Sequence, residues 1–247
     1  MADIATWTTL YAAAVVFGAF VVRGMSGFGT SLVAIPLLIF VMPIHAAVPM
    51  MTVLGLCVTL MLGVRDRGHV RWDEFWRLLG PTLLGVFAGV YLFASLDARF
   101  MQKLLGAFIV AYSLYMVAAQ FVRGSEQRCS TRWGYPAGFA SSAIDSVFGG
   151  GGGPLVVMYM HRRGYDPIAF RATLAVLWLL ELVVRVGGYA LGGYYDRGVL
   201  LLALLFVPVM LLGNRIGEVI GQTISQQSFS RVIAAVLLAS GGSLLLK

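Results

Sequence analysis

The chain has 247 residues, of which 59% are hydrophobic and only 12% are charged, and its mean hydropathy is +0.86. A soluble domain carries roughly 25% charged residues, so this chain has about half the charge that a water-exposed surface requires. The composition therefore excludes a large soluble enzyme. It predicts an integral membrane protein with roughly seven to ten hydrophobic segments.

The net charge of +7 does not indicate a nucleic-acid partner, because the 18 Lys and Arg residues are scattered at the ends of apolar segments. Flanking positive charges are the ordinary topology signal of a protein in a lipid bilayer. The first apolar stretch has no basic region before it, so we expect it to be retained rather than cleaved. Cys57 and Cys129 support neither a disulfide framework nor a zinc site.

The predicted elements are helices, because backbone groups in lipid must be satisfied within their own segment and no run alternates like a barrel strand. Ten apolar runs follow one another, at about 7–22, 31–42, 46–64, 75–94, 103–121, 134–144, 155–160, 169–192, 198–213 and 231–246. The runs 31–42, 134–144 and 155–160 are too short to cross a ~30 Å hydrocarbon core. The fold class is therefore all-α and polytopic, with broken or re-entrant helices at 7–42 and 134–160.

These two breaks occupy corresponding places in a single domain, 1–247, and predict two pseudo-symmetric repeats at about 7–121 and 134–246. An offset of 122 residues places Gly27 on Gly149 and Gly29 on Gly151. With five or six more residues in the second half, further pairs align: Pro81 with Pro208, Gly85 with Gly213, and Gly89 with Gly217. If each break enters the membrane and returns to the side it came from, the loops 65–77, 123–132, 162–171 and 215–231 share one side with twelve positive charges, against four on the other side. This bias favours inverted repeats, with both termini outside the cytoplasm.

The first break, at 23–37, reads RGMSGFGTSLVAIPL. Its glycines are expected to unwind the helix, and Thr30 with Ser31 to cap the half-helix that follows, which leaves free N–H groups and a partial positive charge. Such a helix end suits an anion. Tight helix packing by small residues is the alternative interpretation.

The second break, at 145–155, reads DSVFGGGGGPL. Five consecutive glycines cost a helix about 1 kcal/mol each, so a backbone-lined site is favoured over simple packing. Pro154 suits the first turn of the next half-helix, where its missing N–H costs nothing. Substrate-binding candidates from both breaks are Arg23, Ser26, Gly27, Gly29, Thr30, Ser31, Gly149, Gly151, Gly152 and Gly153.

The paired glycine segments resemble those of the sulfite exporter TauE/SafE family, also called TSUP, and the similarity covers nearly the whole chain. The family's glycine and proline positions fall on Gly24, Gly27, Gly29 and Pro36 and on Gly149, Gly151, Gly152, Gly153 and Pro154. The resemblance implies a multi-pass inner-membrane permease that moves small sulfur-containing or organic anions such as sulfite, thiosulfate or sulfonates.

Four ionisable residues at membrane depth are candidates for function, because charge inside a membrane is costly. Arg23 is either an anion ligand or an interfacial anchor, and Asp145 is either a proton acceptor or a partner of Arg23. Glu181 and Arg185 lie four residues apart, which favours a helical ion pair. The alternative is that Arg185 binds the anion and releases Glu181 to take up a coupling proton.

Two other functions deserve comparison with a transporter. Residues 24–27 resemble the nucleophile motif of rhomboid proteases, but all three histidines, His45, His69 and His161, are expected in loops, out of reach of Ser26. An anion channel would carry the same glycine-lined constriction. The sequence thus predicts a proton-coupled exporter of a small anion, with Asp145 and Glu181 as coupling candidates, rather than an enzyme. No cofactor and no metal site is expected.

Overall fold

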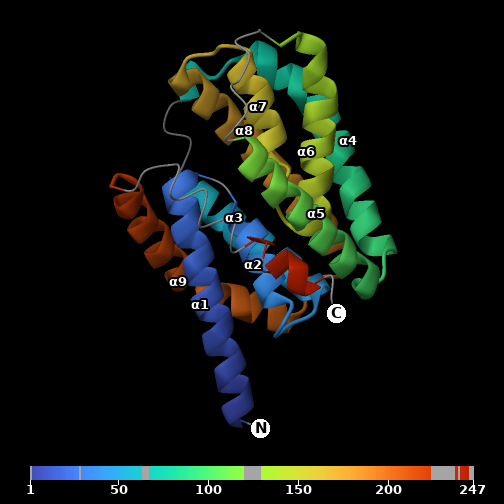
Figure 1. The fold of residues 1–247 in the computed structure, drawn as a ribbon, viewed down its shortest axis with the longest axis vertical. Coiled ribbons are helices and arrows are strands. Elements are labelled where there is room, and N and C mark those ends of the chain that lie inside the picture. The colour runs from blue at the N-terminus through green and yellow to red at the C-terminus, as the bar shows by residue number, and fades with distance from the viewer. Residues whose placement is uncertain are drawn as a thin grey trace. The chain divides into compact units, whose positions relative to one another are not determined.

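The computed structural model describes residues 2–27, 29–62, 67–119, 129–223, 237–238 and 240–244. Within these ranges every regular element is helical (Figure 1), which confirms the all-α prediction. In chain order the helices are α1 (Ala2–Ser26), α2 (Thr30–Leu38), α3 (Ile44–Leu62), η1 (Arg67–His69), α4 (Trp72–Ser95), α5 (Ala98–Ala119), η2 (Thr131–Trp133), α6 (Gly134–Phe148), α7 (Gly153–Arg162), α8 (Pro167–Leu191) and α9 (Arg197–Gly221).

Among the described residues, five helices are long and apolar enough to cross a membrane: α1, α3, α4, α8 and α9. By contrast α2, α6 and α7 have 9, 15 and 10 residues, which rise only about 14, 22 and 15 Å. The short helices therefore occur at the two predicted breaks. Most of the expected last segment, 231–246, lies outside the described residues.

Two local expectations were wrong. The segment expected to end at residue 213 continues as α9 to Gly221, and Asn214, inside this helix, is 5% exposed. Its side-chain amide donates to Glu218 one turn later, at 2.8 Å, so the polar residue is satisfied without ending the helix. His45 and His161 lie in the first turn of α3 and the last turn of α7 rather than in loops.

The chain divides into two compact units, neither of which is a continuous half of the sequence. The first contains Met1–Met51, Leu96–Gly124 and Arg197–Lys247, and the second contains Thr52–Ser95 and Ser125–Asp196. Each unit therefore combines helices from both predicted repeats. The first unit includes α1, α2, α5 and α9, and the second includes α4, α6, α7 and α8.

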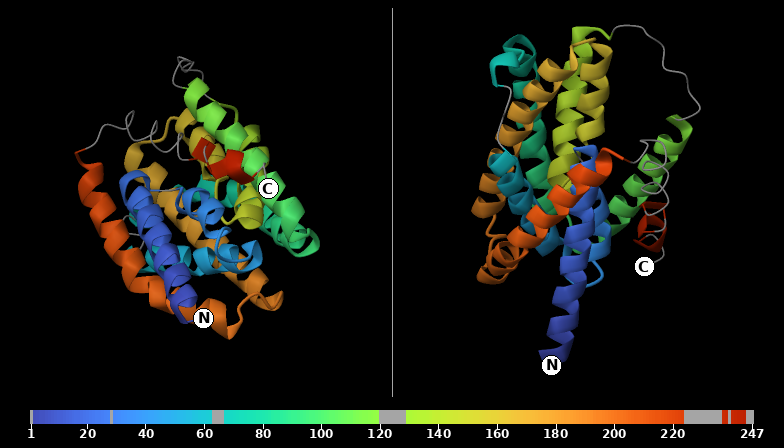
Figure 2. Two further views of the ribbon diagram at one scale, coloured as in Figure 1. Left: turned by 60° about the horizontal axis from the view of Figure 1, so that its bottom comes forward. Right: turned by 90° about the vertical axis from the view of Figure 1, so that its left-hand side faces the viewer.

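Helices α1 and α9 form the main contact of the first unit, and Figure 2 shows α9 lying alongside α1. Glycines permit the close approach, since a Cβ on Gly213 would lie 2.6 Å from the Phe17 carbonyl oxygen and one on Gly217 would lie 2.2 Å from that of Val21. Small residues spaced four apart let helix backbones approach in a membrane protein. Side chains larger than hydrogen would force α1 and α9 apart.

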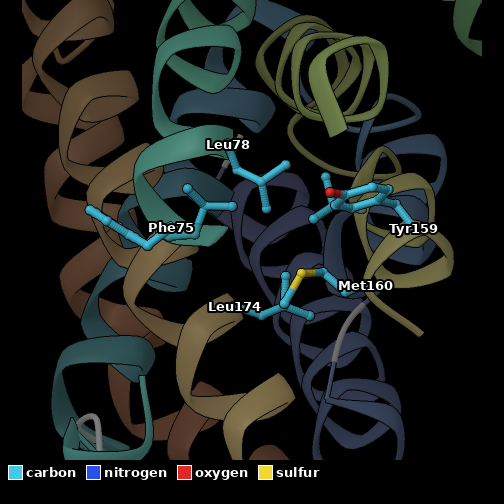
Figure 3. Close-up of a cluster of buried hydrophobic side chains, with 7 residues drawn as sticks. Phe75, Leu78, Tyr159, Met160 and Leu174 are labelled. Atoms are coloured by element: carbon cyan, nitrogen blue, oxygen red, sulfur yellow. The ribbon is translucent and has the colours of Figure 1, made fainter. Parts of the chain in front are cut away.

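Helices α4 and α6 make the corresponding contact in the second unit. A Cβ on Gly85 would lie 2.3 Å from the Phe139 carbonyl oxygen, and one on Gly89 would lie 2.6 Å from that of Ala143. The second unit also contains an apolar cluster contributed by α4, α7 and α8 (Figure 3), whose labelled members are Phe75, Leu78, Tyr159, Met160 and Leu174. These contacts fix α4, α6, α7 and α8 around the second break.

Candidate functional site

The second break is a glycine turn between α6 and α7. Gly149 and Gly151 have φ angles of 76° and 113°, a region that costs other L-residues roughly 1–2 kcal/mol. Gly152 follows, and a Cβ there would lie 1.9 Å from the Ser141 carbonyl oxygen. The turn thus requires glycine for conformation at two positions and for space at a third.

Helix α7 runs back along α6 after this turn. Near the far ends of the two helices, the Cys129 amide donates to the Arg162 carbonyl oxygen at 3.1 Å, and Gly134 lies against the Tyr159 ring. Pro154 lies in the first turn of α7, as the sequence predicts. The glycine turn is therefore the closed end of a helical hairpin.

Asp145 lies in the last turn of α6, just before the glycine turn begins. Its Oδ1 accepts a hydrogen bond from the Gly152 amide at 2.8 Å, and the residue is 8% exposed. Gly152 is the residue immediately before α7, so the carboxylate lies at the positive end of that helix. One of the donors expected to bind substrate is thus engaged by a carboxylate of the chain.

Glu181 and Arg185 of α8 complete a buried charged cluster. Arg185 Nη1 lies 3.7 Å from Glu181 Oε1, and the two residues are 4% and 3% exposed. Arg185 interacts electrostatically with Asp145, and the Ser142 hydroxyl of α6 donates a hydrogen bond to the Glu181 carboxylate. The structure therefore brings together Asp145, Glu181, Arg185 and the glycine turn.

Arg185 is incompletely satisfied in this cluster. Its Nε and Nη1 are buried without a hydrogen-bond partner, as are the hydroxyls of Ser141 and Ser146 on α6. A buried donor left unpaired costs about 1–3 kcal/mol, more when it is charged, and native proteins pair nearly all such groups. The cluster thus offers an anion two charged donors of one guanidinium, Nε and Nη1, that have no hydrogen-bond partner.

The first break has the same backbone form. Gly27 and Gly29 have φ angles of 81° and 87°, and α2 runs back along α1 so that the Tyr11 hydroxyl donates to the Leu37 carbonyl oxygen at 3.3 Å. Gly29, rather than Thr30 or Ser31, precedes the helix, and no side chain caps α2. The expected capping was wrong because the left-handed glycine already ends the turn.

The candidate residues of this first break occupy different environments. Thr30 and Ser31 are buried in the first turn of α2. The Ser26 hydroxyl donates to the Val22 carbonyl oxygen of its own helix at 2.8 Å, and Arg23 lies in the last turn of α1. Arg23 belongs to the first unit and Asp145 to the second, so their pairing stays a prediction.

A second charged cluster was not predicted from the sequence. Glu74 in the first turn of α4 is fully buried; it pairs with Arg77 and with Arg163 and accepts from the Tyr159 hydroxyl. Glu74 carried no signal, because an acidic residue in the first turn is an ordinary feature of helices. The cluster ties the far end of the α6–α7 hairpin to α4.

Together the long apolar helices, the glycine hairpins and the buried charges define a multi-pass membrane protein of the transporter class. The sequence profile of the sulfite exporter TauE/SafE family matches residues 11–244, and the chain belongs to this family. It is also 26% identical over 179 residues to the "Probable inner membrane transporter protein TsaS" of Comamonas testosteroni, covering 71% of this chain and 73% of that protein. No solved structure matches the chain significantly.

Proposed function

We propose that this chain exports small sulfur-containing or organic anions, such as sulfite, thiosulfate or sulfonates, across the inner membrane and couples their movement to protons. The buried Arg185 carries this proposal, because its Nε and Nη1 have no hydrogen-bond partner. A hydrogen bond from a charged guanidinium to an oxyanion is about twice as strong as a neutral one, so these donors favour the oxygens of a sulfonate or sulfite group. The relative named for an inner membrane supports the location.

Proton coupling is supported by the two carboxylates beside Arg185. An isolated anion entering a buried site adds negative charge that the bilayer interior disfavours. Protonation of Asp145 or Glu181 offsets that charge, so that anion and proton enter the site together. The Glu181–Arg185 separation of 3.7 Å is long for a direct hydrogen bond, which leaves the guanidinium available to a second anionic partner.

The first break supplies a second set of candidate ligands: Arg23, Ser26, Gly27, Gly29, Thr30 and Ser31. In the second break, Gly149, Gly151, Gly152 and Gly153 occupy the corresponding backbone. We assign both glycine turns to the substrate path, because irregular backbone at membrane depth is tolerated where it is buried in protein or lines a cavity.

Corresponding contacts support two repeats, about 7–121 and 134–246. The positive φ angles of Gly27 and Gly29 recur 122 residues later at Gly149 and Gly151. The contact of Gly213 with Phe17 matches that of Gly85 with Phe139, and the contact of Gly217 with Val21 matches that of Gly89 with Ala143. In these pairs the α1 and α6 residues differ by 122 positions and the α4 and α9 residues by 128. Inverted repeats of this kind are typical of transporters.

The test is flux into proteoliposomes of radiolabelled sulfite, thiosulfate and a short sulfonate, with and without a pH gradient. We expect flux of at least one anion that follows the gradient. Arg185→Ala should abolish it, whereas Arg215→Ala should not, because the Arg215 side chain is 82% exposed. Arg23→Ala tests the first break in the same assay.

Two outcomes would contradict the proposal. Flux that ignores the pH gradient would indicate an anion channel, and no flux of the three anions would remove the substrate assignment. Neutral Asp145→Asn and Glu181→Gln variants that both keep gradient-driven flux would exclude these carboxylates from coupling.

A further inference from the structure

We propose that Asp145 competes with the substrate for the Gly152 amide. Its carboxylate accepts the hydrogen bond that a substrate oxyanion would accept, and protonation of Asp145 allows the oxyanion to replace it. The inference rests on the proposed anion transport and assigns the coupling proton to one of the two candidate carboxylates. It concerns the second unit alone, where every contact below is found.

The first step is the bond between Asp145 Oδ1 and the Gly152 amide, at 2.8 Å. A helix N-terminus attracts negative charge through its free N–H groups and its dipole. Asp145 reaches it from α6 because the glycine turn brings Gly152 against Ser141, one turn before Asp145. A carboxylate of the chain thus holds the position that suits a substrate oxyanion.

The second step is the set of unpaired donors beside this carboxylate. Arg185 interacts with Asp145 electrostatically, is 4% exposed, and has Nε and Nη1 without hydrogen-bond partners. The unpaired hydroxyl of Ser141 belongs to the residue one turn before Asp145 on α6, whereas Ser146 faces Gly89 of α4. An oxyanion of three oxygens can use the donors of Arg185 and Ser141 and the Gly152 amide together.

The third step is the charge balance. With Asp145 and Glu181 ionised, the cluster has two negative charges against the single positive charge of Arg185. A singly charged oxyanion arriving with one proton on Asp145 leaves this sum unchanged. A proton on Asp145 also removes the charge that competes for the α7 N-terminus, so that the anion replaces the carboxylate at Gly152 and at Arg185.

Other titratable groups around Asp145 are few. From α8, Glu181, Arg185 and Tyr189 interact with it. The charged residues of α4 lie in its first two turns, beside the far end of the hairpin: Asp73, Glu74 and Arg77. The titratable residues of α7 lie in its second half: Tyr159, His161 and Arg162. Glu181 is therefore the only rival for the proton among these groups.

Two features distinguish Asp145 from Glu181. Asp145 bonds to the helix N-terminus, whereas Glu181 is the i,i+4 partner of Arg185 on the same helix and bonds to Ser142. Neutralising Asp145 removes the negative charge that competes for the Gly152 amide, whereas neutralising Glu181 removes a negative charge that lies 3.7 Å from Arg185 and is not at that amide. The two carboxylates thus make different predictions for anion affinity.

The experiment measures the Kd of ethanesulfonate, whose single charge is constant above pH 5, by calorimetry on the purified full-length protein in detergent between pH 5.5 and 8.5. For the wild type we expect Kd to rise with pH, by up to about tenfold per pH unit for one linked proton. Asp145→Asn should bind with a Kd that is low and independent of pH. Glu181→Gln is the matched control and should keep the pH dependence.

Asp145→Glu guards against a folding defect, since it retains a carboxylate and should retain the pH dependence. A wild-type Kd that is constant with pH would overturn the inference, and so would a pH dependence that survives in Asp145→Asn or disappears only in Glu181→Gln. Liposome flux with pH-independent binding would overturn this inference and leave the transport proposal intact. No flux and no binding at any pH would overturn both.

Discussion

Alanine in place of Gly85 is expected to destabilise the α4–α6 pair, although alanine is the better helix former. The added Cβ would lie 2.3 Å from the Phe139 carbonyl oxygen, whereas ordinary van der Waals contact begins at 3.4 Å. The helices must therefore separate by about 1 Å at this contact, and overpacking of this kind costs about 1–3 kcal/mol. The gain in helix propensity offsets at most ~1 kcal/mol of that cost.

Gly80 provides the control on the same helix, because a Cβ there would meet nothing within 4 Å. Gly80→Ala should keep the propensity gain alone, so the two variants should differ by about 1–3 kcal/mol. For a chain of this size each kcal/mol shifts Tm by about 2–4 °C, which predicts a difference of roughly 2–12 °C in thermal unfolding in detergent. Equal Tm values for Gly85→Ala and Gly80→Ala would refute the close approach of α4 and α6.

Three further changes test other parts of the structure. Tyr159→Phe removes the hydroxyl that donates to the buried Glu74 and should lower stability by about 1–2 kcal/mol; Tyr91→Phe, at a residue 72% exposed, should leave Tm unchanged, and equal effects would contradict the role of this bond. The Ala169 and Ile168 amides hold the pKa of Asp166 below its ordinary value. The stability that the ionised Asp166 contributes is present above about pH 4 and is lost as pH falls through the lowered pKa. The Tm of the wild type should therefore fall more between pH 5 and pH 3 than that of Asp166→Asn. Parallel curves of Tm against pH would contradict a stabilising role of Asp166. Gly29 has a φ of 87° and free space around its Cβ position, so Gly29→Val should lose roughly 1 kcal/mol more than Gly29→Asn, which tolerates this conformation; identical unfolding curves would exclude backbone strain as the reason for glycine.

Hydrophobic runs predicted the helices and the positions of both breaks, because length and apolarity decide what crosses lipid. They failed at Asn214, where the local polarity of Asn and Arg suggested a helix end. The structure satisfies Asn214 through Glu218 and places its carbonyl oxygen 2.2 Å from a Cβ on Gly24. Burial of this residue depends on a helix that lies nearly 200 positions earlier in the chain, and no local pattern contains that contact.

The sequence predicted the residues of the candidate site better than the contacts between distant segments. Glycine runs indicated the two turns, and the i,i+4 spacing indicated the Glu181–Arg185 pair. The bond from Gly152 to Asp145 was not expected, because it depends on the glycine turn folding back onto α6. The Glu74 cluster was missed for the same reason: its partners, Tyr159 and Arg163, come from a different helix and the loop after it.

The exchange of helices between the halves sets an order for biosynthesis. Helix α4 ends at Ser95 and its partner α6 begins at Gly134. Helix α1 ends at Ser26, but its partner α9 begins only at Arg197. At roughly 5–20 residues per second, the first interval lasts about 2–8 s and the second about 9–34 s. Every residue of the second unit has been synthesised by Asp196. The second unit can therefore assemble first, while the face of α1 that contacts α9 needs lipid or the insertion machinery to cover it until α9 emerges.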